Sequence, residues 1–580
     1  MGTLITSRDL AEALGRSLAQ EASALANMIG PYRAATLPAG TPRGFRHTLA
    51  AEPSGDAQRG AALLAGRFTL AGETLNVPAG ESVWELPAPS RGFAARLHGF
   101  AWLEDILAVR DAAARETALV LLDDWIAGFG RWNSFAWSPA LIARRVRAWL
   151  NAGALLGEGD DRRAIDARFR SLARQAARLS RTLSLLPASE ERIEAAITLI
   201  KAQISLGLKD RFRARAEKQL VADLKAQILA DGGHVSRAPL AAARILAGLV
   251  QMDALASEAG CALDPEIHRA TDRLAGAVRF FRLGPKGLAG FHGGGEGTTR
   301  LIEAALRGRE KVKPFNVAPH SGYHRAEAGG SVVIMDTAGP ARGPHGLNAH
   351  ASALSFEFAP PGGRLIVNCG WSEDQPASWR EAVRATAAHS ALTLEETSSA
   401  RLIRPGWKRN LLGTRFETGP DPVRARRNEE DVGIWLEASH DGYRKAFGMG
   451  VRRRVFLAVD GGDLRGEDGI YRPVEDGPPD DPEKLIRFAI RFHMHPGVKA
   501  SLSRDSLSAL LVLPNGDGWR FRTDGGPVRL ERSVYLAAGG TPVRSTQLVI
   551  AGEAEGFGGG DRPPNRVRWA FQRLGRVGGA

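Results

Sequence analysis

The chain has 580 residues, of which 44% are hydrophobic and 24% are charged, and its formal net charge at pH 7 is +13. This length excludes a single hydrophobic core and predicts two or three domains, and the composition is that of an ordinary soluble globular protein. The positive charge favours an acidic partner, such as a polysaccharide, an anionic membrane face or nucleic acid. Nucleic acid is the weakest of the three, because the arginines are scattered and few aromatic residues lie among them.

The cysteines and the N-terminus exclude further classes. Cys261 and Cys369 are far apart and form neither a disulfide framework nor a CxxC metal site. The chain has no apolar run of 18 residues, so we expect no transmembrane helix. The N-terminal MGTLITSRDLAEALGRSLAQ has no basic segment followed by an apolar run and a cleavage site, which predicts a cytoplasmic protein unless an export signal precedes this start.

After a Gly- and Pro-rich stretch near residues 35–92, apolar residues recur three and four positions apart as far as about residue 310. This period predicts successive amphipathic helices joined by short loops, with no strand between them. Such helices stack as antiparallel pairs in a bundle, a solenoid or a closed ring. The segments are LHGFAWLEDILAVRDAAARE, ETALVLLDDWIAGF, PALIARRVRAWLNAGALL, AIDARFRSLARQAARLSRTLSLL, SEERIEAAITLIKAQISLGL, RAEKQLVADLKAQILADGG and PLAAARILAGLVQMDAL.

Beyond residue 315 the period changes to two, which is typical of short strands. SVVIMDTAG, ALSFEFAP, GRLIVNCG, ALTLEET, IWLEASHDG, RRVFLAVDG, LIRFAIRFHMHP and QLVIAGEA are separated by turn residues. NGDG at residues 515–518 predicts a hairpin. In ALSFEF, residues 353–358, alternation of small or polar with apolar residues predicts a half-buried strand. Helices followed by strands predict an α+β protein with an antiparallel β-sandwich.

Three glycine-rich or histidine-rich segments carry candidate functional residues. In DGGHVSRAP, residues 231–239, we expect Ser236 to cap the following helix and His234 and Arg237 to lie on the loop before it. FHGGGEG, residues 291–297, lacks the Lys-Ser/Thr ending of a phosphate loop but allows close approach to a ligand, with His292 and Glu296 as its ionisable members. A plain loop explains each segment about as well.

A third segment, APHSGYHRAEAGG at residues 318–330, joins the two halves, where a ligand cleft is common. It contains His320, Tyr323, His324 and Arg325. Packing of a linker is an equally good explanation.

The segment HGLNAHASALSFEF, residues 345–358, places polar residues ahead of a strand. We expect Asn348 and His350 to face a cleft between the halves, and His345 to belong to the loop. His350 and His389 are two candidate zinc ligands, with Asn368 as a third, although zinc favours a carboxylate over a neutral amide. His493 and His495 form a second candidate pair, and in both places histidines bound only by water or protein are the alternative.

Together these segments resemble the heparinase II/III family of polysaccharide lyases over nearly the whole chain. The motifs are FTLAG, LHGFAWLEDIL, DGGHVSR, GGGEG, SGYHR and, most specifically, HGLNAHASALSFEF, GGRLIVNCGW and RATAAHSALTL. The resemblance implies a lead-in segment over residues 1–94, an incomplete α/α toroid over 95–312 and a β-sandwich over 313–580. It also implies β-elimination on acidic, uronate-containing polysaccharides in the cleft between the last two, usually in the bacterial periplasm.

This chemistry needs a group that neutralises the uronate carboxylate, a base that removes the C5 proton and an acid that protonates the leaving oxygen. If the protein is a lyase, His234 or Asn348 is the candidate neutraliser and Tyr323 or His292 the candidate base and acid, with His350 in support. Arg237, Glu296 and Arg325 are candidate substrate-binding residues, and His350, Asn368 and His389 the candidate site for one zinc ion.

The chain also departs from the pattern that the resemblance implies. Where active relatives read His-x-His-x-Asp, this sequence has Asn348-Ala-His350-Ala-Ser352, and Asn368 stands near the position of a zinc-binding aspartate. The helical half has no tyrosine between Tyr32 and Tyr323, although the family uses one there, and Ala238 stands where relatives often have asparagine.

Two hypotheses remain open. The first, towards which the family motifs lean, is a lyase acting on an acidic polysaccharide. The second is a relative that binds an anionic glycan without cleaving it. A hydrolase that uses Glu296 has less support.

Overall fold

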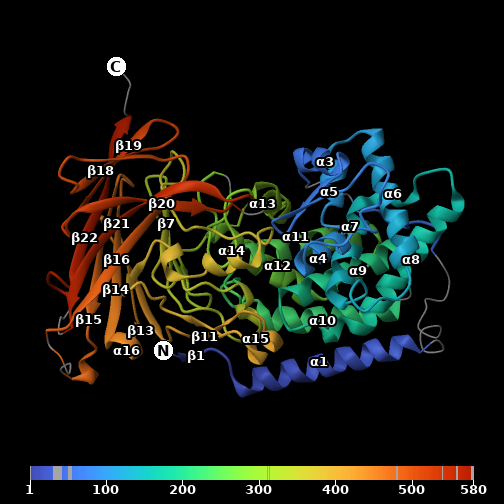
Figure 1. Ribbon diagram of the computed structural model, residues 1–580, viewed down its shortest axis with the longest axis horizontal. Coiled ribbons are helices and arrows are strands. Elements are labelled where there is room, and N and C mark those ends of the chain that lie inside the picture. Colours follow the sequence, from blue (N-terminus) through green and yellow to red (C-terminus); the bar gives the residue numbers. More distant parts are fainter. Residues whose placement is uncertain are drawn as a thin grey trace.

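The computed structural model describes residues 2–29, 42–49, 55–208, 210–285, 287–309, 311–312, 314–477, 481, 483–537, 540–556 and 560–576. A helical lobe and a strand-rich lobe lie side by side (Figure 1). Helices precede strands along the chain, so the predicted α+β class is confirmed: an incomplete α/α toroid is followed by an antiparallel β-sandwich.

The helices of the toroid form two rows. In the inner row α5 packs on α7, α7 on α9, α9 on α11 and α11 on α13, while α6, α8, α10 and α12 lie outside and pack against their neighbours in sequence. Their bounds are α3 (Ala57–Leu64), α4 (Arg91–His98), α5 (Leu103–Ala108), α6 (Ala112–Phe129), α7 (Pro139–Ala152), α8 (Arg162–Thr182), α9 (Glu190–Leu206), α10 (Asp210–Gln227), α11 (Pro239–Glu258), α12 (Pro265–Phe280) and α13 (Thr299–Leu306).

Helix α9 of the inner row is buried on nearly every side over most of its length, which explains its long apolar run. In α9 every residue from Ala195 to Leu206 is buried. Helix α11 is long and apolar enough to cross a membrane by length and composition alone, but most of it is covered by its neighbours. Among the described residues it is the one helix of this kind, and the core helix of a globular domain meets the same criteria.

The strand-rich lobe is built from two large antiparallel sheets. One has the order β20-β21-β16-β8-β7-β6-β5-β4, with β9 also pairing β16, and the other the order β12-β13-β14-β15-β22-β19-β18-β17. Their bounds are β4 (Val317–Ala318), β5 (Tyr323–Ala328), β6 (Ser331–Asp336), β7 (Phe356–Ala359), β8 (Ile366–Val367), β9 (Leu392–Leu394), β12 (Val423–Glu430), β13 (Gly433–Tyr443), β14 (Met449–Ala458), β15 (Asp463–Tyr471), β16 (Leu485–Met494), β17 (Lys499–Leu502), β18 (Ser508–Val512), β19 (Asp517–Thr523), β20 (Val528–Tyr535), β21 (Val543–Glu555) and β22 (Arg566–Arg576).

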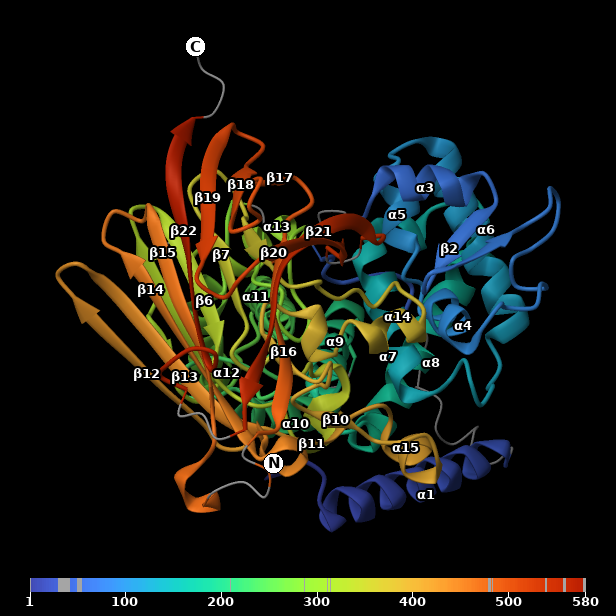
Figure 2. The ribbon, with the colours of Figure 1, turned by 60° about the vertical axis from the view of Figure 1, so that its left-hand side comes forward.

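The N-terminal segment crosses both lobes, so it does not form a unit of its own. Strand β1 (Gly2–Thr3) pairs with β11 (Phe416–Gly419), which also pairs with β10 (Arg401–Leu402). Helix α1 (Ser7–Met28), capped by Thr6, then runs beneath the toroid and packs on α15 (Trp407–Leu412) (Figure 2). The short antiparallel hairpin of β2 (Arg67–Leu70) and β3 (Glu73–Asn76) follows α3. The helical series ends at Leu306 and β4 begins at Val317.

Two expectations about strands have different outcomes. The hairpin is confirmed, because β18 and β19 pair across Asn515 and Gly516, and Gly516 has a φ of +87°. The half-buried strand at residues 353–358 is wrong. Strand β7 begins only at Phe356, after a turn in which Leu354 has a φ of +64°. Both of its faces are buried, since the helical lobe covers the side that carries Glu357.

A buried ion pair joins β14 and β15 of the eight-stranded sheet and contacts the segments before β7 and β9 of the other sheet. The Arg453 guanidinium binds both oxygens of Asp468 at 2.8 and 2.9 Å and donates to the backbone oxygens of Leu354 and Ser390. Trp569 donates to the same carboxylate at 2.9 Å. Arg453 and Asp468 are at most 2% exposed, so neither charge can be left alone without a large desolvation cost.

We therefore expect Asp468→Ala to lower the free energy of unfolding of the β-sandwich by about 3 kcal/mol or more, because it leaves the Arg453 charge buried and unpaired. Urea unfolding followed by tryptophan fluorescence measures the loss. The double variant Arg453→Met/Asp468→Leu removes both charges and should recover much of it. A double variant no more stable than Asp468→Ala would contradict this account.

Candidate functional site

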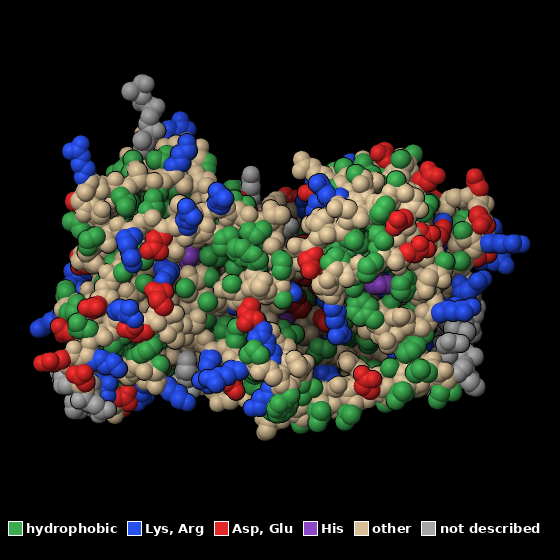
Figure 3. Space-filling view, in the orientation of Figure 1, with side chains coloured by type: hydrophobic (Ala, Val, Ile, Leu, Met, Phe, Trp, Pro, Cys, Tyr) green, Lys and Arg blue, Asp and Glu red, His purple; other side chains and the backbone are tan. Residues whose placement is uncertain are grey.

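The lobes enclose a cleft of about 1,060 Å³. Its walls come from α3, α4, α7, α9 and α11 on the helical side, and from η3 (Gly343–Asn348) and the loop 371–375 on the other. In Figure 3 the surface is hollowed between the lobes, and side chains of both charges lie there. Of the predicted site residues, His234, His292 and Asn348 line this cleft, together with His345 and Ala238.

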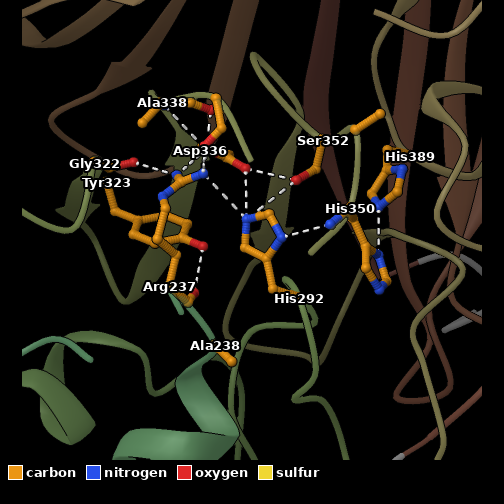
Figure 4. A network of polar contacts seen from close by, with 12 residues as sticks. Arg237, Ala238, His292, Gly322, Tyr323, Asp336, Ala338, His350, Ser352 and His389 are labelled. Atoms are coloured by element: carbon orange, nitrogen blue, oxygen red, sulfur yellow. Dashed lines mark hydrogen bonds and ion pairs between the residues drawn. The ribbon is translucent and has the colours of Figure 1, made fainter. Parts of the chain in front are cut away.

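Arg237 lies beneath the cleft floor, where it joins the two lobes. Its Nε donates to the backbone oxygen of Ser321 at 2.8 Å, and its Nη atoms donate to those of Gly322 and Gly339 at 3.0 and 2.6 Å. It also forms an ion pair with Asp336, the last residue of β6 (Figure 4). Arg237 is 7% exposed and does not line the cleft, so it is a structural link between the lobes rather than a residue that a substrate reaches.

Asp336 collects several donors. Besides Arg237, it accepts a hydrogen bond from Ser352 Oγ at 2.6 Å, and His292 Nε2 lies 3.3 Å from its Oδ2. Burial alone would raise the pKa of Asp336, but Arg237 and the hydrogen bonds from His292 and Ser352 lower it well below its ordinary value. The carboxylate is therefore ionised and fully engaged.

His292 is held in one tautomer by these contacts. Its Nδ1 accepts the backbone N–H of His350 at 2.9 Å, so in the neutral ring the proton is on Nε2, which faces Asp336 and also lies 3.2 Å from Arg237 Nη1. Burial lowers the pKa of His292 although the Asp336 hydrogen bond opposes the shift. At 1% exposure only an edge of the ring reaches the cleft floor. Neither nitrogen is available to exchange a proton with a ligand.

Tyr323 does not reach the cleft. Its hydroxyl donates to the backbone oxygen of Arg237 at 2.7 Å, and its ring packs against Phe281 and beneath the Arg237 guanidinium. The side chain is fully buried, and burial raises its pKa well above the ordinary value. Among the described residues no tyrosine lines the cleft; Tyr32 lies outside them.

His234 faces the cleft but is also fully engaged. Its Nδ1 accepts the backbone N–H of Ser236 at 3.2 Å, and its Nε2 donates to Oε1 of Gln227 at 3.1 Å. Burial and the nearby His345 lower its pKa to about 3, so the ring is neutral. The expected helix cap is wrong, because Ser236 bonds His234 while the N-cap of α11 is Ala238.

His345 and Asn348 are the polar groups that η3 presents to the cleft. Asn348 is exposed, and His345 lies with its ring centre 6.0 Å from that of His234. Within the described part of the chain, His345 Nδ1 has no hydrogen-bond partner. Burial, Arg415 and Arg192 lower its pKa to about 4. The positions of His345 and His350 are thus the reverse of the expected ones: His345 lines the cleft and His350, 1% exposed, lies behind it.

The predicted zinc ligands do not fit that ion. His389 Nδ1 donates to the backbone oxygen of Ala385 at 2.8 Å, so its Nε2 accepts from His350 Nδ1 at 3.0 Å. Asn368 Oδ1 accepts the backbone N–H of Ser390, and its Nδ2 donates to Glu357. The facing nitrogens are used by each other and no carboxylate joins them. The described residues contain no group of three or more His, Cys, Asp or Glu that could hold a metal.

The remaining candidates lie away from the cleft. Arg325 is buried and donates to the backbone oxygens of Phe280 and Arg282, and Glu296 accepts a hydrogen bond from His495 Nε2 at 2.8 Å. His493 is bonded to Ser533 and the backbone oxygen of Ala387. None of these side chains lines the cleft.

Sequence reasoning missed the charged walls of the cleft. Arg144 and Arg147 on α7 bind Glu191 and Glu194 on α9 at 3.0 and 2.9 Å. The only signal in the sequence is the spacing: the two arginines are three residues apart, as are the two glutamates, so each pair of like residues lies on one face of its helix. Which helix faces which depends on how the toroid packs.

Comparison with known proteins agrees with this architecture. A family model described as Heparinase II/III-like, C-terminal, matches residues 310–570. FtsZ-localized protein C of Caulobacter vibrioides is 35% identical over 524 residues, which are 89% of this chain and 88% of that protein. The chain belongs to the heparinase II/III-like family.

Crystal structures of heparinase III and of a heparan sulfate lyase share its fold. A crystal structure of heparinase III aligns with a TM-score of 0.68 at 13% identity and covers 92% of this chain and 86% of its own. Heparan sulfate lyase HepC from Pedobacter heparinus aligns with a TM-score of 0.53 at 13% identity, over 90% and 83% of the two chains. At these identities the likeness concerns the fold alone.

The buried histidines predict the pH dependence of stability. The pKa of His234 is about 3 in the folded protein and about 6.5 when unfolded, so the unfolded chain takes up the proton first as pH falls. The contribution of His234 to the free energy of unfolding is therefore complete above pH 6.5 and is lost progressively as the pH falls below that value. Each histidine with such a shift lowers the free energy of unfolding at pH 5 by about 2 kcal/mol relative to pH 8.

We expect His234→Gln to reduce the difference in unfolding free energy between pH 8 and pH 5 by about 2 kcal/mol, because one of the titrating groups is removed. Urea unfolding at the two pH values, on wild type and variant, measures it. An unchanged difference would mean that His234 is not held neutral in the folded protein.

Proposed function

We propose that the protein binds a polysaccharide chain in the interdomain cleft and does not cleave it by β-elimination. Membership of a lyase family and a cleft of about 1,060 Å³ between the lobes support polysaccharide binding. The absence of cleavage is inferred from the candidate acid–base residues, whose polar atoms are hydrogen-bonded within the protein. Tyr323 is buried and bonded to the backbone, and both nitrogens of His292 and of His234 are occupied.

The lyase hypothesis requires a base within reach of the sugar C5 proton. The remaining candidate at the cleft is His345, whose Nδ1 has no partner among the described residues. A pKa of about 4 makes it a weak base, and no tyrosine from the described part of the chain stands near it in the cleft wall. A neutral His345 and the amide of Asn348 are suited to hydrogen bonds with sugar hydroxyl and amide groups.

We expect no unsaturated uronate when the purified protein is incubated with heparin, heparan sulfate, alginate, chondroitin or hyaluronan, with or without zinc. The ultraviolet absorbance of the unsaturated product measures this, with an active heparinase as the positive control. A rise in absorbance on any of these substrates that is lost in His345→Ala would establish a lyase and overturn the proposal.

The binding half has its own test. Asn348→Ala should weaken binding to a panel of immobilised polysaccharides about tenfold, because the cleft loses an exposed hydrogen-bonding amide. Asn428→Ala, on the exposed edge strand β12, is the matched control and should bind as wild type does. Equal binding by all three proteins would place the glycan outside the cleft.

The relative from Caulobacter vibrioides supports a second proposal, because its name associates that protein with FtsZ and 89% of this chain aligns with it. We propose that this chain also localises with FtsZ. A fluorescent fusion of the chain, expressed in Caulobacter vibrioides, should coincide with labelled FtsZ and disperse when FtsZ is depleted. A diffuse signal in cells with intact FtsZ structures would contradict it.

A further inference from the structure

The walls of the cleft are charged but balanced. Its lining includes seven arginines and seven carboxylates, and no lysine from the described residues. The excess positive charge of the chain therefore lies elsewhere. Part of it lies on the outward side of the eight-stranded sheet, where Arg424, Arg452 and Arg568 point away from the sandwich core. A net charge of +13 thus says little about what the cleft binds.

On the helical wall two arginines of α7 are each paired with a glutamate of α9. Arg144 Nη2 lies 3.0 Å from Glu191 Oε1, and Arg147 Nη1 lies 2.9 Å from Glu194 Oε2. Both pairs join α7 to the first turns of α9, and the four side chains are between 20% and 43% exposed. They are accessible from the cleft, and each positive charge there stands beside a negative one.

From the opposite wall, the loop 371–375 supplies two carboxylates that reach across the cleft. Glu373 forms ion pairs with Arg244 on α11 and Arg96 on α4, and Asp374 forms a second pair with Arg96. Arg59 on α3 lies 4.0 Å from Asp374 and 3.0 Å from Asp105. Arg244 holds the pKa of Glu373 well below its usual range.

A further carboxylate makes the same region less favourable for the binding of an anion. Glu190 Oε1 lies 4.0 Å from Arg244 Nη1, beside Glu194 and Glu373. Burial, with the neighbouring Glu194 charge, raises the pKa of Glu190 to about 7. An added ligand carboxylate or sulfate would meet these acidic groups at the same place.

We propose that the cleft selects polysaccharides whose sugar units carry neither uronate nor sulfate, and that the fixed ion pairs along its walls exclude polyanions. This inference rests on the proposed function and gives its ligand a chemical class. At five of the seven cleft arginines a polyanion must break an Arg–carboxylate pair to gain the cation, and only Arg67 and Arg380 line the cleft, among the described residues, without an ion pair. An uncharged sugar needs hydrogen-bonding groups and apolar surface, which Asn348, His345, Gln375 and Trp371 provide.

The test uses calorimetric titration of the full chain with three probes of defined charge. Cellohexaose is uncharged, chitohexaose is uncharged but N-acetylated, and a heparin hexasaccharide is a polyanion. We expect the wild type to bind one or both neutral probes at least about tenfold more tightly than the heparin hexasaccharide. To bind, the polyanion must break at least one Arg–carboxylate pair, and the free energy of that pair corresponds to about a tenfold change in affinity.

Two variants test the mechanism. Glu191→Gln frees Arg144 within the helical wall, and Glu373→Gln removes the carboxylate that Arg244 and Arg96 share between the lobes. Each should raise affinity for the heparin hexasaccharide about tenfold and leave affinity for the neutral probes within about twofold. Glu395→Gln, which frees Arg487 on the surface of the sandwich, makes the same charge change outside the cleft and should alter neither. Glu191→Gln does not touch the contact between lobes, so it remains informative if Glu373→Gln unfolds.

The outcomes separate this inference from the proposed function. Wild type that prefers the heparin hexasaccharide, or an affinity for it that Glu191→Gln leaves unchanged, overturns the inference and leaves polysaccharide binding standing. Wild type that binds no probe, with heparin binding gained by Glu191→Gln but not by Glu395→Gln, overturns the proposed function and supports the exclusion of polyanions by paired arginines. Binding of nothing by any of the proteins overturns both.

Discussion

The Arg237 guanidinium holds the two lobes in register. Arg237 lies on the loop before α11, and its side chain extends beneath the cleft floor. There its guanidinium contacts backbone oxygens at the start of the β-domain and the carboxylate of Asp336. Such a charge is tolerated in the interior only when every donor has a partner. The groups that satisfy it, and those that satisfy Asp336 in turn, are therefore no longer available for chemistry. His292 and Ser352 are held in this way by Asp336, and Tyr323 is held by its hydrogen bond to the backbone oxygen of Arg237.

The chain has the architecture of its family, and the candidate acid–base side chains of its cleft are engaged with other protein groups. The toroid and sandwich still enclose a space large enough for several sugar units, and η3 still delivers polar side chains to it. What these side chains offer is uncharged: an amide from Asn348 and a neutral imidazole from His345. Five of the seven arginines that line the cleft are paired with carboxylates, chiefly from α9 and from the loop 371–375. Both facts point to recognition without elimination.

The sequence predicts the fold well because periodicity reports burial directly. The change from a period near 3.6 to a period of two falls between α13 and β4, and the asparagine–glycine hairpin is where expected. Side-chain direction is harder to predict. His345 and His350 both precede the same strand, but a short helical turn ends at Asn348, and Leu354 then takes a positive φ. These two local features turn His345 towards the cleft and bury His350. The pairing of Arg144 with Glu191 depends on tertiary register, which no local pattern encodes.

The central claim is that the histidine network beneath the cleft is a structural link between the lobes and does not take part in acid–base catalysis. The protonation state of His292 tests it most directly. In protein labelled with ¹⁵N-histidine, comparison of wild type with His292→Gln assigns the His292 ring nitrogens. The account predicts a proton on Nε2, an unprotonated Nδ1 and a pKa below the ordinary value of a histidine. A His292 ring that exchanges tautomers, or that gains a second proton near neutral pH, would contradict it and return His292 to the list of catalytic candidates.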